Sequence, residues 1–320
     1  MHKYKPENKA LWDSFVSKAK NATFLFQRDF MGYHQDRFED YSLMVYKKEK
    51  LIAVLPANAS DKRVFSHQGL TYGGLLFSDM LKLKDVSVCL KLVLQYFQSN
   101  GFAYLHLKQL PTIYSPIPND ELQYLMFVLD AKLLGRETFS VLKLDNKPKL
   151  SKDRVAGKKR AIKQNLVVKE EKDLAAFWNN ILIPNLAEKH QAKPVHSLEE
   201  ITYLKTKFPN NIRQFNVYLE DVLVAGTTIF ETKQVAHSQY ISANVDKNLI
   251  GSLDFLHIHL IEKVFKDKMY FDFGTSNTNQ GRNINAGLQY WKEGFGARTI
   301  TQDFYEIDLS SANKLDALFI

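Results

Sequence analysis

Residues 45–53 read VYKKEKLIA and residues 217–225 read VYLEDVLVA, which is the same pattern displaced by 172 positions. In both stretches an apolar strand runs into a short charged turn, and a second apolar strand follows. Alternating apolar stretches around a short polar turn predict a β-hairpin. The architecture of the chain therefore depends on how far this repeat extends.

The repeat continues beyond the hairpin. Ser66-His67-Gln68 has a loose echo in His237-Ser238-Gln239, and residues 90–107 match residues 256–273 as an amphipathic helix followed by a short aromatic strand. Two copies of one supersecondary unit predict two similar domains, each a mixed α/β sheet flanked by helices. We expect the first domain over residues 1–150 and the second over residues 151–320. Chance similarity between two ordinary hairpins is the alternative.

The composition is that of a globular protein. The chain has 320 residues, of which 45% are hydrophobic and 24% charged, and this length is comfortable for two hydrophobic cores. No stretch approaches the ~20 apolar residues of a membrane span, and the N-terminal sequence lacks the apolar region of a signal peptide. The one cysteine, Cys89, lies in an apolar helical stripe, where a buried and inert thiol is expected. These features predict a soluble cytoplasmic protein without a transmembrane segment.

The positive charge of the chain is concentrated in one stretch. The net charge is +8, and residues 145–164 contain eight basic and two acidic side chains. This stretch separates the two repeats, so a solvated linker is one interpretation. A basic surface for a phosphorylated substrate, a cofactor or tRNA is the other. Under the second interpretation, Lys159 and Arg160 are candidate substrate-binding residues.

The most specific motif lies in the second half. Phe271-Asp272-Phe273-Gly274 is followed by NAGLQYWKEGFG over residues 285–296, and this pair of segments is similar to the "DFG … GL..FK..FG" element of the Fem-type aminoacyltransferases. The order of hairpin, strand, loop, helix, strand and helix resembles the GNAT (N-acetyltransferase) fold. Two such domains in one chain resemble the Fem-type enzymes and their acyl-CoA-dependent relatives in envelope polysaccharide synthesis. The resemblance implies a tandem GNAT-fold acyltransferase.

Three residues are candidates for catalysis. The resemblance implies that Lys292 lies in the active cleft; a lysine on the helix surface is the alternative. Asp272, on a strand with a buried pattern, is the candidate carboxylate base, although an aspartate there can instead cap the next loop. Ser238, Tyr240, Ser242 and Asn244 share one face of a strand by two-residue alternation, and Tyr240 is the third candidate.

The resemblance also implies where an acyl donor binds. In GNAT folds the loop after this strand holds the pyrophosphate of coenzyme A at the start of a helix, and here the loop is residues 246–252. The candidate cofactor-binding residues are Ser242, Asn244, Lys247, Gly251 and Ser252. The loop departs from the usual pattern because it has one glycine and a displaced lysine. We expect acetyl-CoA or another acyl-CoA as co-substrate, and no metal, because no metal-ligand spacing is found.

Polar and aromatic side chains elsewhere are candidates for binding the acceptor. They are Arg28, His34, Arg37, His67, Tyr72 and His196. Each residue alone is more often structural, and together they indicate a cleft rich in hydrogen-bond donors.

We predict an N-acyltransferase that moves an acyl group from acyl-CoA to an amino group of a cell-envelope precursor, such as a nucleotide-linked amino sugar or another small amine. The first alternative is a Fem-type transferase that uses aminoacyl-tRNA to extend a peptidoglycan precursor. The second is a non-catalytic binding protein with a degenerate GNAT site.

Overall fold

The computed structural model describes residues 1–320, with only the backbone described at His190. The chain divides into two compact units: unit 1 comprises residues 1–137, 280–282 and 301–320, and unit 2 comprises residues 138–279 and 283–300. These units differ from the expected ranges, because residues 138–150 belong to unit 2 and residues 301–320 belong to unit 1. The reason is strand pairing: residues 304–308 pair with a strand of unit 1, whereas residues 141–143 pair with a strand of unit 2.

Unit 1 contains short strands and helices at its start and one long helix in its middle. The strands of unit 1 are β1 (His2–Lys3), β2 (Glu39–Asp40), β3 (Leu43–Lys47), β4 (Lys50–Leu55), β5 (Asn58–Ser60), β6 (Arg63–Phe65), β7 (Leu76–Phe77), β8 (Tyr104–Lys108) and most of β17 (Arg298–Asp308). Its α-helices are α1 (Lys9–Val16), α2 (Arg28–Met31), α3 (Leu83–Ser99) and α4 (Glu121–Val128). The strands of unit 1 lie in two sheets, in which the neighbouring strands follow the orders β1-β3-β4-β7 and β17-β8-β6-β5-β2.

Helix α3 forms because its apolar residues recur every three or four positions. Its buried side chains include Val86, Cys89, Leu90, Val93, Leu94 and Phe97, and they belong to one hydrophobic cluster with β3, β4 and β8. Cys89 is buried as expected, and burial raises the pKa of its thiol to about 11. Such a thiol is a packing residue, because the thiolate is the reactive form.

Unit 2 has one larger sheet with helices on both faces. Its strands are β9 (Lys132–Lys143, which begins in unit 1), β10 (Val167–Glu171), β11 (Ile212–Leu219), β12 (Val222–Glu231), β13 (Val235–Ala243), β14 (Tyr270–Thr275), β15 (Asn277–Thr278) and β16 (Asn283–Ile284). Its α-helices are α5 (Lys152–Lys163), α6 (Ala175–Phe177), α7 (Ile183–His190), α8 (Leu198–Lys207), α9 (Lys247–Ile250), α10 (Ser252–His259) and α11 (Ala286–Glu293). The strand order of the larger sheet is β10-β11-β12-β13-β14-β9, and β15 pairs with β16 in a separate two-stranded sheet.

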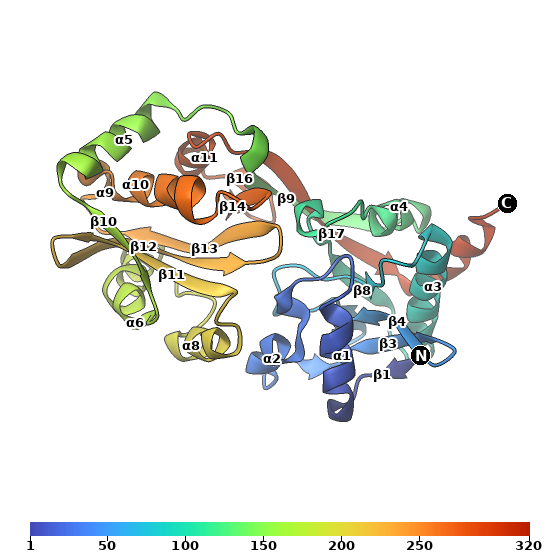
Figure 1. Cartoon of the computed structure of the whole chain (residues 1–320). Helices are drawn as coiled ribbons and strands as arrows, with labels where there is room; N and C mark the ends of the chain where they lie inside the picture. The colour runs from blue at the N-terminus through green and yellow to red at the C-terminus, as the bar shows by residue number, and fades with distance from the viewer. The chain divides into compact units, whose positions relative to one another are not determined.

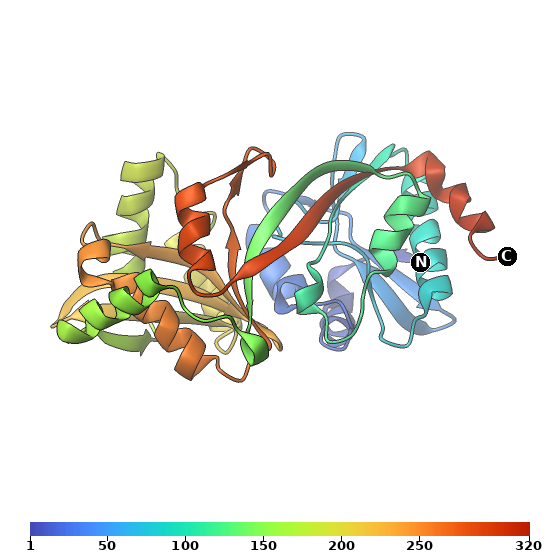
Figure 2. The same cartoon turned by 90° about the horizontal axis from the view of Figure 1, so that it is seen from above.

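The helices of unit 2 are distributed over the two faces of this sheet. Figure 1 shows α5 and α10 over one face, and α6 and α8 over the other. Figure 2 looks onto the face that α5 and α10 cover. Helix α8 begins at Ser197, whose hydroxyl accepts a hydrogen bond from the Glu200 amide while the Glu200 carboxylate accepts one from the Ser197 amide. A serine followed three residues later by a glutamate is the sequence signature of such a capping box.

The two units repeat one connectivity, which confirms the mixed α/β tandem architecture. The antiparallel hairpin β3-β4 corresponds to β11-β12, and each hairpin is followed by a parallel strand pair with a helix between its strands. The units differ in one respect. The long strand β13 has two short counterparts in unit 1, of which β6 pairs with β8 and β7 pairs with β4. Among the described residues, no helix is both long and apolar enough to cross a bilayer.

The first prediction concerns Gly157, where the backbone of α5 lies close to the start of α10. A Cβ atom on Gly157 would lie 1.9 Å from Asp254 Oδ2, whereas nothing lies within 4 Å of a Cβ placed on Gly32. We expect Gly157→Ala to lower the free energy of unfolding of unit 2 by about 1–3 kcal/mol, because α5 must move outward. Urea unfolding followed by tryptophan fluorescence measures this loss. Gly32→Ala is the matched control, and equal midpoints for the two variants would contradict the prediction.

Candidate functional site

Strands β13 and β14 pair over three positions and then separate. The parallel pairs are Val235 with Tyr270, Ala236 with Phe271, and His237 with Asp272. Beyond His237, β13 continues to Ala243 with β12 as its partner. We call the point of separation the fork of unit 2.

Asp272 and Gly274 produce the fork. The Gly274 amide donates a hydrogen bond to Asp272 Oδ1 at 2.7 Å, which is the short-range turn that aspartate forms with the second residue after it. Gly274 has a φ of +70°, a conformation that glycine adopts without steric cost. The register of β14 against β9 also shifts between Asp272 and Thr275. The DFG segment therefore bends β14 away from β13.

The other oxygen of Asp272 holds a histidine at the fork. His237 Nδ1 lies 2.8 Å from Asp272 Oδ2, and the carboxylate is completely buried whereas 12% of the His237 side chain is exposed. Because a carboxylate oxygen accepts hydrogen bonds, this contact places a proton on Nδ1, and in the neutral tautomer with that proton Nε2 carries the lone pair. Within the described part of the chain, the His237 ring makes its hydrogen bond through Nδ1, and Nε2 makes none. Nε2 is therefore the ring nitrogen that can contact a ligand at the fork.

Lys292 is buried behind the bend in β14. Its side chain is 2% exposed, and Nζ donates hydrogen bonds to the carbonyl oxygens of Gly274 at 3.0 Å and Thr275 at 2.7 Å. Burial lowers the pKa of Lys292 to about 8, while the nearby Asp272 carboxylate acts in the opposite direction. The amine therefore fixes the backbone that carries the fork, and its predicted catalytic role stays a prediction.

A pocket of about 550 Å³ lies between the end of β13 and helix α11. Ile241, Ser242 and Ala243 line it from β13, and Leu288 and Trp291 line it from α11. Lys189 and Lys247 line it as well. Burial lowers the pKa of Lys247, and the positive charge of Lys189 lowers it further. The pocket thus contains two amines that repel each other, and a bound anion would reduce this repulsion.

Two of the predicted cofactor-binding residues line this pocket, and three do not. Ser242 accepts a hydrogen bond from Asn185 Nδ2 at 2.9 Å, and Lys247 stands at the start of α9. Asn244 has a buried Oδ1, and Ser252 is completely buried with no partner for Oγ among the described residues. A Cβ atom on Gly251 would lie 2.2 Å from the carbonyl oxygen of Gly157, so the backbone of Gly251 faces α5 rather than the pocket.

The start of α10 does not fit a pyrophosphate. Asp254 occupies its first turn, and the Asp254 carboxylate accepts hydrogen bonds from Arg154 Nη1 at 2.7 Å and Trp291 Nε1 at 2.9 Å. Burial raises the pKa of Asp254, and the Arg154 guanidinium opposes this shift. A protein carboxylate therefore already occupies the end of the helix that favours negative charge. Anion binding in the pocket would rest on Lys189 and Lys247.

The predicted shared face of β13 is wrong for Ser238. A register shift in the pairing of β12 with β13 separates Thr228, opposite Tyr240, from Ile229, opposite Ser238. Such a bulge changes the face on which the following side chains lie. Ser238 Oγ lies 3.4 Å from His257 Nε2 of α10, whereas the ring of Tyr240 packs on Trp178.

Tyr240 and His196 are the two predicted residues that β13 brings together. The Tyr240 hydroxyl lies 2.6 Å from His196 Nδ1, and both side chains are buried. This contact joins β13 to the segment before α8 on the face opposite α10.

In unit 1 the predicted substrate residues fall into separate places. Arg28 contacts the Asp40 carboxylate and lies over the Tyr4 ring at 3.8 Å, and the hydroxyl of Tyr72 donates to Thr23 Oγ1 at 3.0 Å. These two side chains hold the N-terminal segments together.

His34 and His67 are stacked with their ring centroids 5.2 Å apart, and both are buried. Burial lowers the pKa of His34, and it lowers that of His67 to about 3. Arg37 lies over the Tyr33 ring at 5.7 Å. Of the unit 1 candidates, His67 lines a pocket, which is described below.

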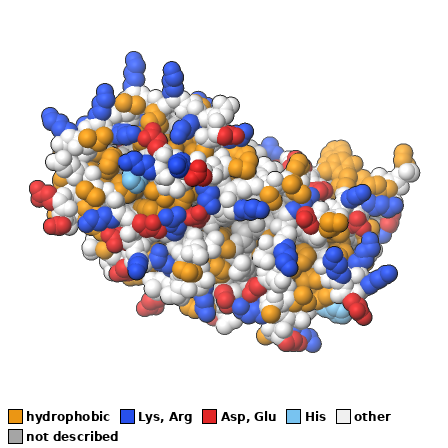
Figure 3. Space-filling model, viewed as in Figure 1, with side chains coloured by type: hydrophobic (Ala, Val, Ile, Leu, Met, Phe, Trp, Pro, Cys, Tyr) orange, Lys and Arg blue, Asp and Glu red, His pale blue; other side chains and the backbone are white. Residues whose placement is uncertain are grey.

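The predicted basic residues of α5 face solvent. Lys159 and Arg160 are exposed, as are Lys152 and Lys163. Figure 3 shows a concentration of Lys and Arg side chains over the part of unit 2 where α5 lies. The opposite side of α5 packs on α10 through Gly157.

Sequence reasoning missed His237 as a functional residue. The sequence indicated His237 only through the loose match of His237-Ser238-Gln239 with Ser66-His67-Gln68. The pairing partner of His237 depends on the register of two strands, in which His237 and Asp272 are 35 positions apart. The register of a parallel pair is set by tertiary packing, so the sequence alone did not bring His237 to Asp272.

Comparison with known proteins identifies the fold. No family model and no curated protein sequence matches this chain. The solved structure of FemX is similar with a TM-score of 0.68 and 9% identity, covering 98% of this chain and 99% of that one. L-PGS from Bacillus licheniformis is similar with a TM-score of 0.62 and 11% identity, covering 98% and 95%.

A tandem GNAT protein from the clavulanic acid biosynthesis pathway is similar with a TM-score of 0.50 and 13% identity, covering 95% of each chain. These similarities extend over the whole length of the chain and confirm the predicted Fem-like tandem GNAT fold. At identities this low they establish the fold alone.

The buried amine of Lys292 sets the second prediction. Its pKa is lowered from 10.5 in the unfolded chain to about 8 in the fold, so between these values the unfolded state binds more protons. The stability of unit 2 should therefore rise with pH from about 8 to 10.5, by at most ~1.4 kcal/mol per pH unit. We expect Lys292→Met to remove this rise, as measured by urea unfolding at pH 8, 9 and 10. An identical pH slope in the variant would contradict the assignment.

Proposed function

We propose that this chain is an N-acyltransferase whose reaction takes place at the fork of unit 2. The observation that carries the proposal is the His237–Asp272 pair, because it presents a ring nitrogen able to accept a proton where two strands separate. Transfer of an acyl group to an amine requires such a group, since an ammonium ion cannot attack a carbonyl carbon. The fold similarity to FemX and to a tandem GNAT protein supports the same class.

Each side chain of the fork has a defined part in this reaction. His237 Nε2 takes a proton from the ammonium group of the acceptor, and Asp272 stabilises the imidazolium that forms. The free amine then attacks the carbonyl carbon of the donor, so a C–N bond forms while the C–O or C–S bond to the carrier breaks. His237 returns its proton to the leaving oxygen or sulfur, and the new amide nitrogen, which still carries one proton too many after the attack, releases that second proton to water. Lys292 is a positioning residue, because it acts through the carbonyl groups of Gly274 and Thr275.

The open edge of β13 can supply hydrogen-bond donors for the carbonyl oxygen that becomes negatively charged during the reaction. Beyond His237, β13 has no strand partner on its β14 side within the described chain. Amide groups on such an edge point outward and can donate to the oxygen of a carbonyl group, where negative charge develops during the attack. The pocket between β13 and α11 adjoins this edge.

We further propose that the donor is an aminoacyl ester carried by tRNA rather than an acyl-CoA. Two observations favour this alternative. The start of α10, where a pyrophosphate was expected, is closed by Gly157 and carries the Asp254 carboxylate. The exposed side of α5 is basic, which suits the backbone of a nucleic acid. The acceptor would then be an amine on a cell-envelope precursor, such as a peptidoglycan precursor.

The third prediction concerns the proton acceptor. We expect His237→Gln to lower kcat by about 10²–10⁴-fold, because glutamine can hydrogen-bond to Asp272 but cannot accept a proton. The measurement is transfer of a radiolabelled acyl group, with charged tRNA and acetyl-CoA as donors and peptidoglycan precursors and nucleotide-linked amino sugars as acceptors. His259→Gln, a half-buried histidine of α10 outside the fork, is the matched control. Unchanged kcat in His237→Gln would refute the assignment, and no transfer from either donor would favour the non-catalytic alternative.

The fourth prediction distinguishes the donors. If α5 binds tRNA, replacing Lys152, Lys159, Arg160 and Lys163 together by Gln should weaken tRNA binding by at least tenfold and reduce its salt dependence, because fewer counterions are released. Filter binding at several salt concentrations measures both quantities. Replacing four exposed lysines of unit 1 (Lys48, Lys50, Lys62 and Lys82) gives a control with the same change in net charge. Equal effects of the two quadruple variants, or firm binding of acetyl-CoA that depends on Lys247, would contradict the tRNA proposal and favour acyl-CoA as the donor.

A further inference from the structure

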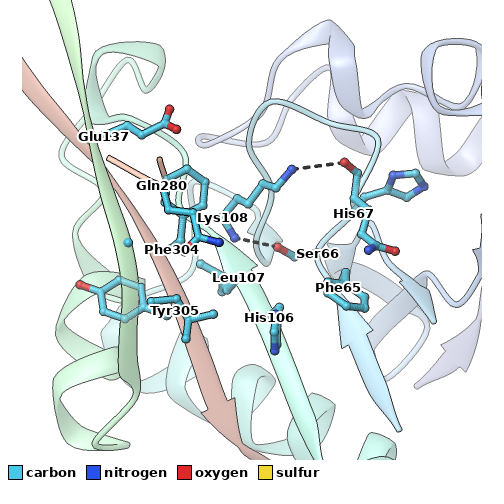
Figure 4. Close-up of a pocket in the computed structure, with 13 residues that line it drawn as sticks. Phe65, Ser66, His67, His106, Leu107, Lys108, Glu137, Gln280, Phe304 and Tyr305 are labelled. Carbon is cyan, nitrogen blue, oxygen red and sulfur yellow. Dashed lines mark hydrogen bonds between the residues drawn. The ribbon is translucent and has the colours of Figure 1, made fainter. Parts of the chain in front are cut away.

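Unit 1 contains a second fork with different chemistry. Strands β6 and β8 pair in parallel at three positions, and the last pair is Phe65 with His106. This pair occupies the place in unit 1 that His237 and Asp272 occupy in unit 2. Directly beyond it, residues of both strands and of the loop after β6 line a pocket of about 480 Å³ (Figure 4). A pocket of this size is in the range that holds small molecules.

Lys108 forms the cationic part of this pocket. Its Nζ donates hydrogen bonds to the carbonyl oxygens of Gln68 at 3.2 Å and Leu70 at 3.0 Å. Figure 4 shows the Lys108 side chain extended toward the loop that carries His67. An ammonium group has three N–H donors, so one donor remains for a ligand. Burial lowers the pKa of Lys108, which indicates that the charged form lacks full solvation.

Glu137 forms the anionic part. It lies on β9, it is half-buried, and within the described part of the chain its carboxylate has no hydrogen bond or ion pair. Burial raises the pKa of Glu137, and Lys108 opposes this shift. A partly desolvated carboxylate that accepts no hydrogen bond costs free energy that a cationic ligand would recover.

The rest of the pocket is apolar or neutral. Phe65, Leu107, Leu134 and Phe304 supply apolar surface. Burial holds the pKa of His67 at about 3, so this histidine adds no charge at neutral pH. Apart from His106, which contacts Glu306, the described residues that line the pocket therefore offer one positive and one negative group among apolar and uncharged polar side chains.

We propose that the pocket of unit 1 binds a free α-amino acid with an apolar side chain. The ammonium group of the ligand would pair with Glu137, its carboxylate would accept a hydrogen bond from the free donor of Lys108, and its side chain would lie against Phe65 and Phe304. A zwitterion satisfies both charged groups at once, whereas a singly charged ligand leaves one of them unpaired. The proposal concerns unit 1 alone and does not rest on the chemistry of the fork in unit 2.

Calorimetry on the full chain tests the proposal with matched ligands. L-phenylalanine and L-leucine are the zwitterionic probes, 2-phenylethylamine lacks the carboxylate, and 3-phenylpropionate lacks the ammonium group. We expect at least one zwitterion to bind about tenfold or more tightly than both singly charged analogues. Glu137→Gln should weaken binding of the zwitterion and the amine by about tenfold or more, and it should not weaken binding of 3-phenylpropionate, because the lost carboxylate repels an anion. Glu49→Gln, an exposed residue in the turn of the β3-β4 hairpin, is the control.

Two results would overturn the proposal. The first is an absence of binding by both zwitterions up to about 10 mM, a concentration that detects even weak complexes. The second is equal affinity of wild-type protein and Glu137→Gln for the zwitterions. Glu137→Gln keeps the shape of the side chain and removes no hydrogen bond or ion pair of the described chain, so the variant should fold. A circular dichroism melting curve verifies this before titration.

Discussion

The carboxylate of Asp272 is the group on which the architecture of unit 2 depends. One oxygen accepts the Gly274 amide and bends β14, and the other contacts His237 and orients its ring. The bend separates the two strands, and the oriented ring lies at the resulting gap, where under the proposed function it accepts a proton. Because one buried carboxylate produces both features, the shape of the fork and its chemistry are coupled. Lys292 reinforces this coupling by hydrogen-bonding the carbonyl groups of the bent segment.

The duplicated fold shows how one backbone arrangement carries two kinds of chemistry. Both units contain a parallel strand pair that separates after three residue pairs. In unit 2 the last pair is a histidine and a buried aspartate, whereas in unit 1 it is a phenylalanine and a histidine whose Nε2 lies 2.8 Å from Glu306. The charged residues of the unit 1 fork lie beyond the last pair, at Lys108 and Glu137. Under the two proposals, the unit 1 fork binds a ligand and the unit 2 fork transfers a proton.

The sequence predicted the repeated hairpins, the buried stripe of α3 and the DFG segment, because these features are encoded locally by periodicity and by glycine. It did not predict the His237–Asp272 contact, because that contact depends on strand register across 35 positions. It placed Ser238 on the face of Tyr240, because simple alternation does not anticipate a bulge in β13. Most of the expected substrate residues of unit 1, such as Arg28 and Tyr72, pair within the fold, and such pairings are invisible without coordinates.

The two sides of helix α5 both bear on which acyl donor the protein uses. On its inner side, the backbone of α5 at Gly157 packs closely against the backbone at Gly251, just before α10. Arg154 of α5 forms an ion pair with Asp254 at the start of α10. The position that would hold the phosphates of a small donor is therefore occupied by groups of the protein itself. The outer side of the same helix carries exposed basic residues, which suit a larger polyanion that need not enter the fold. Under the proposed function, one helix thus disfavours acyl-CoA at this position and favours a donor attached to nucleic acid.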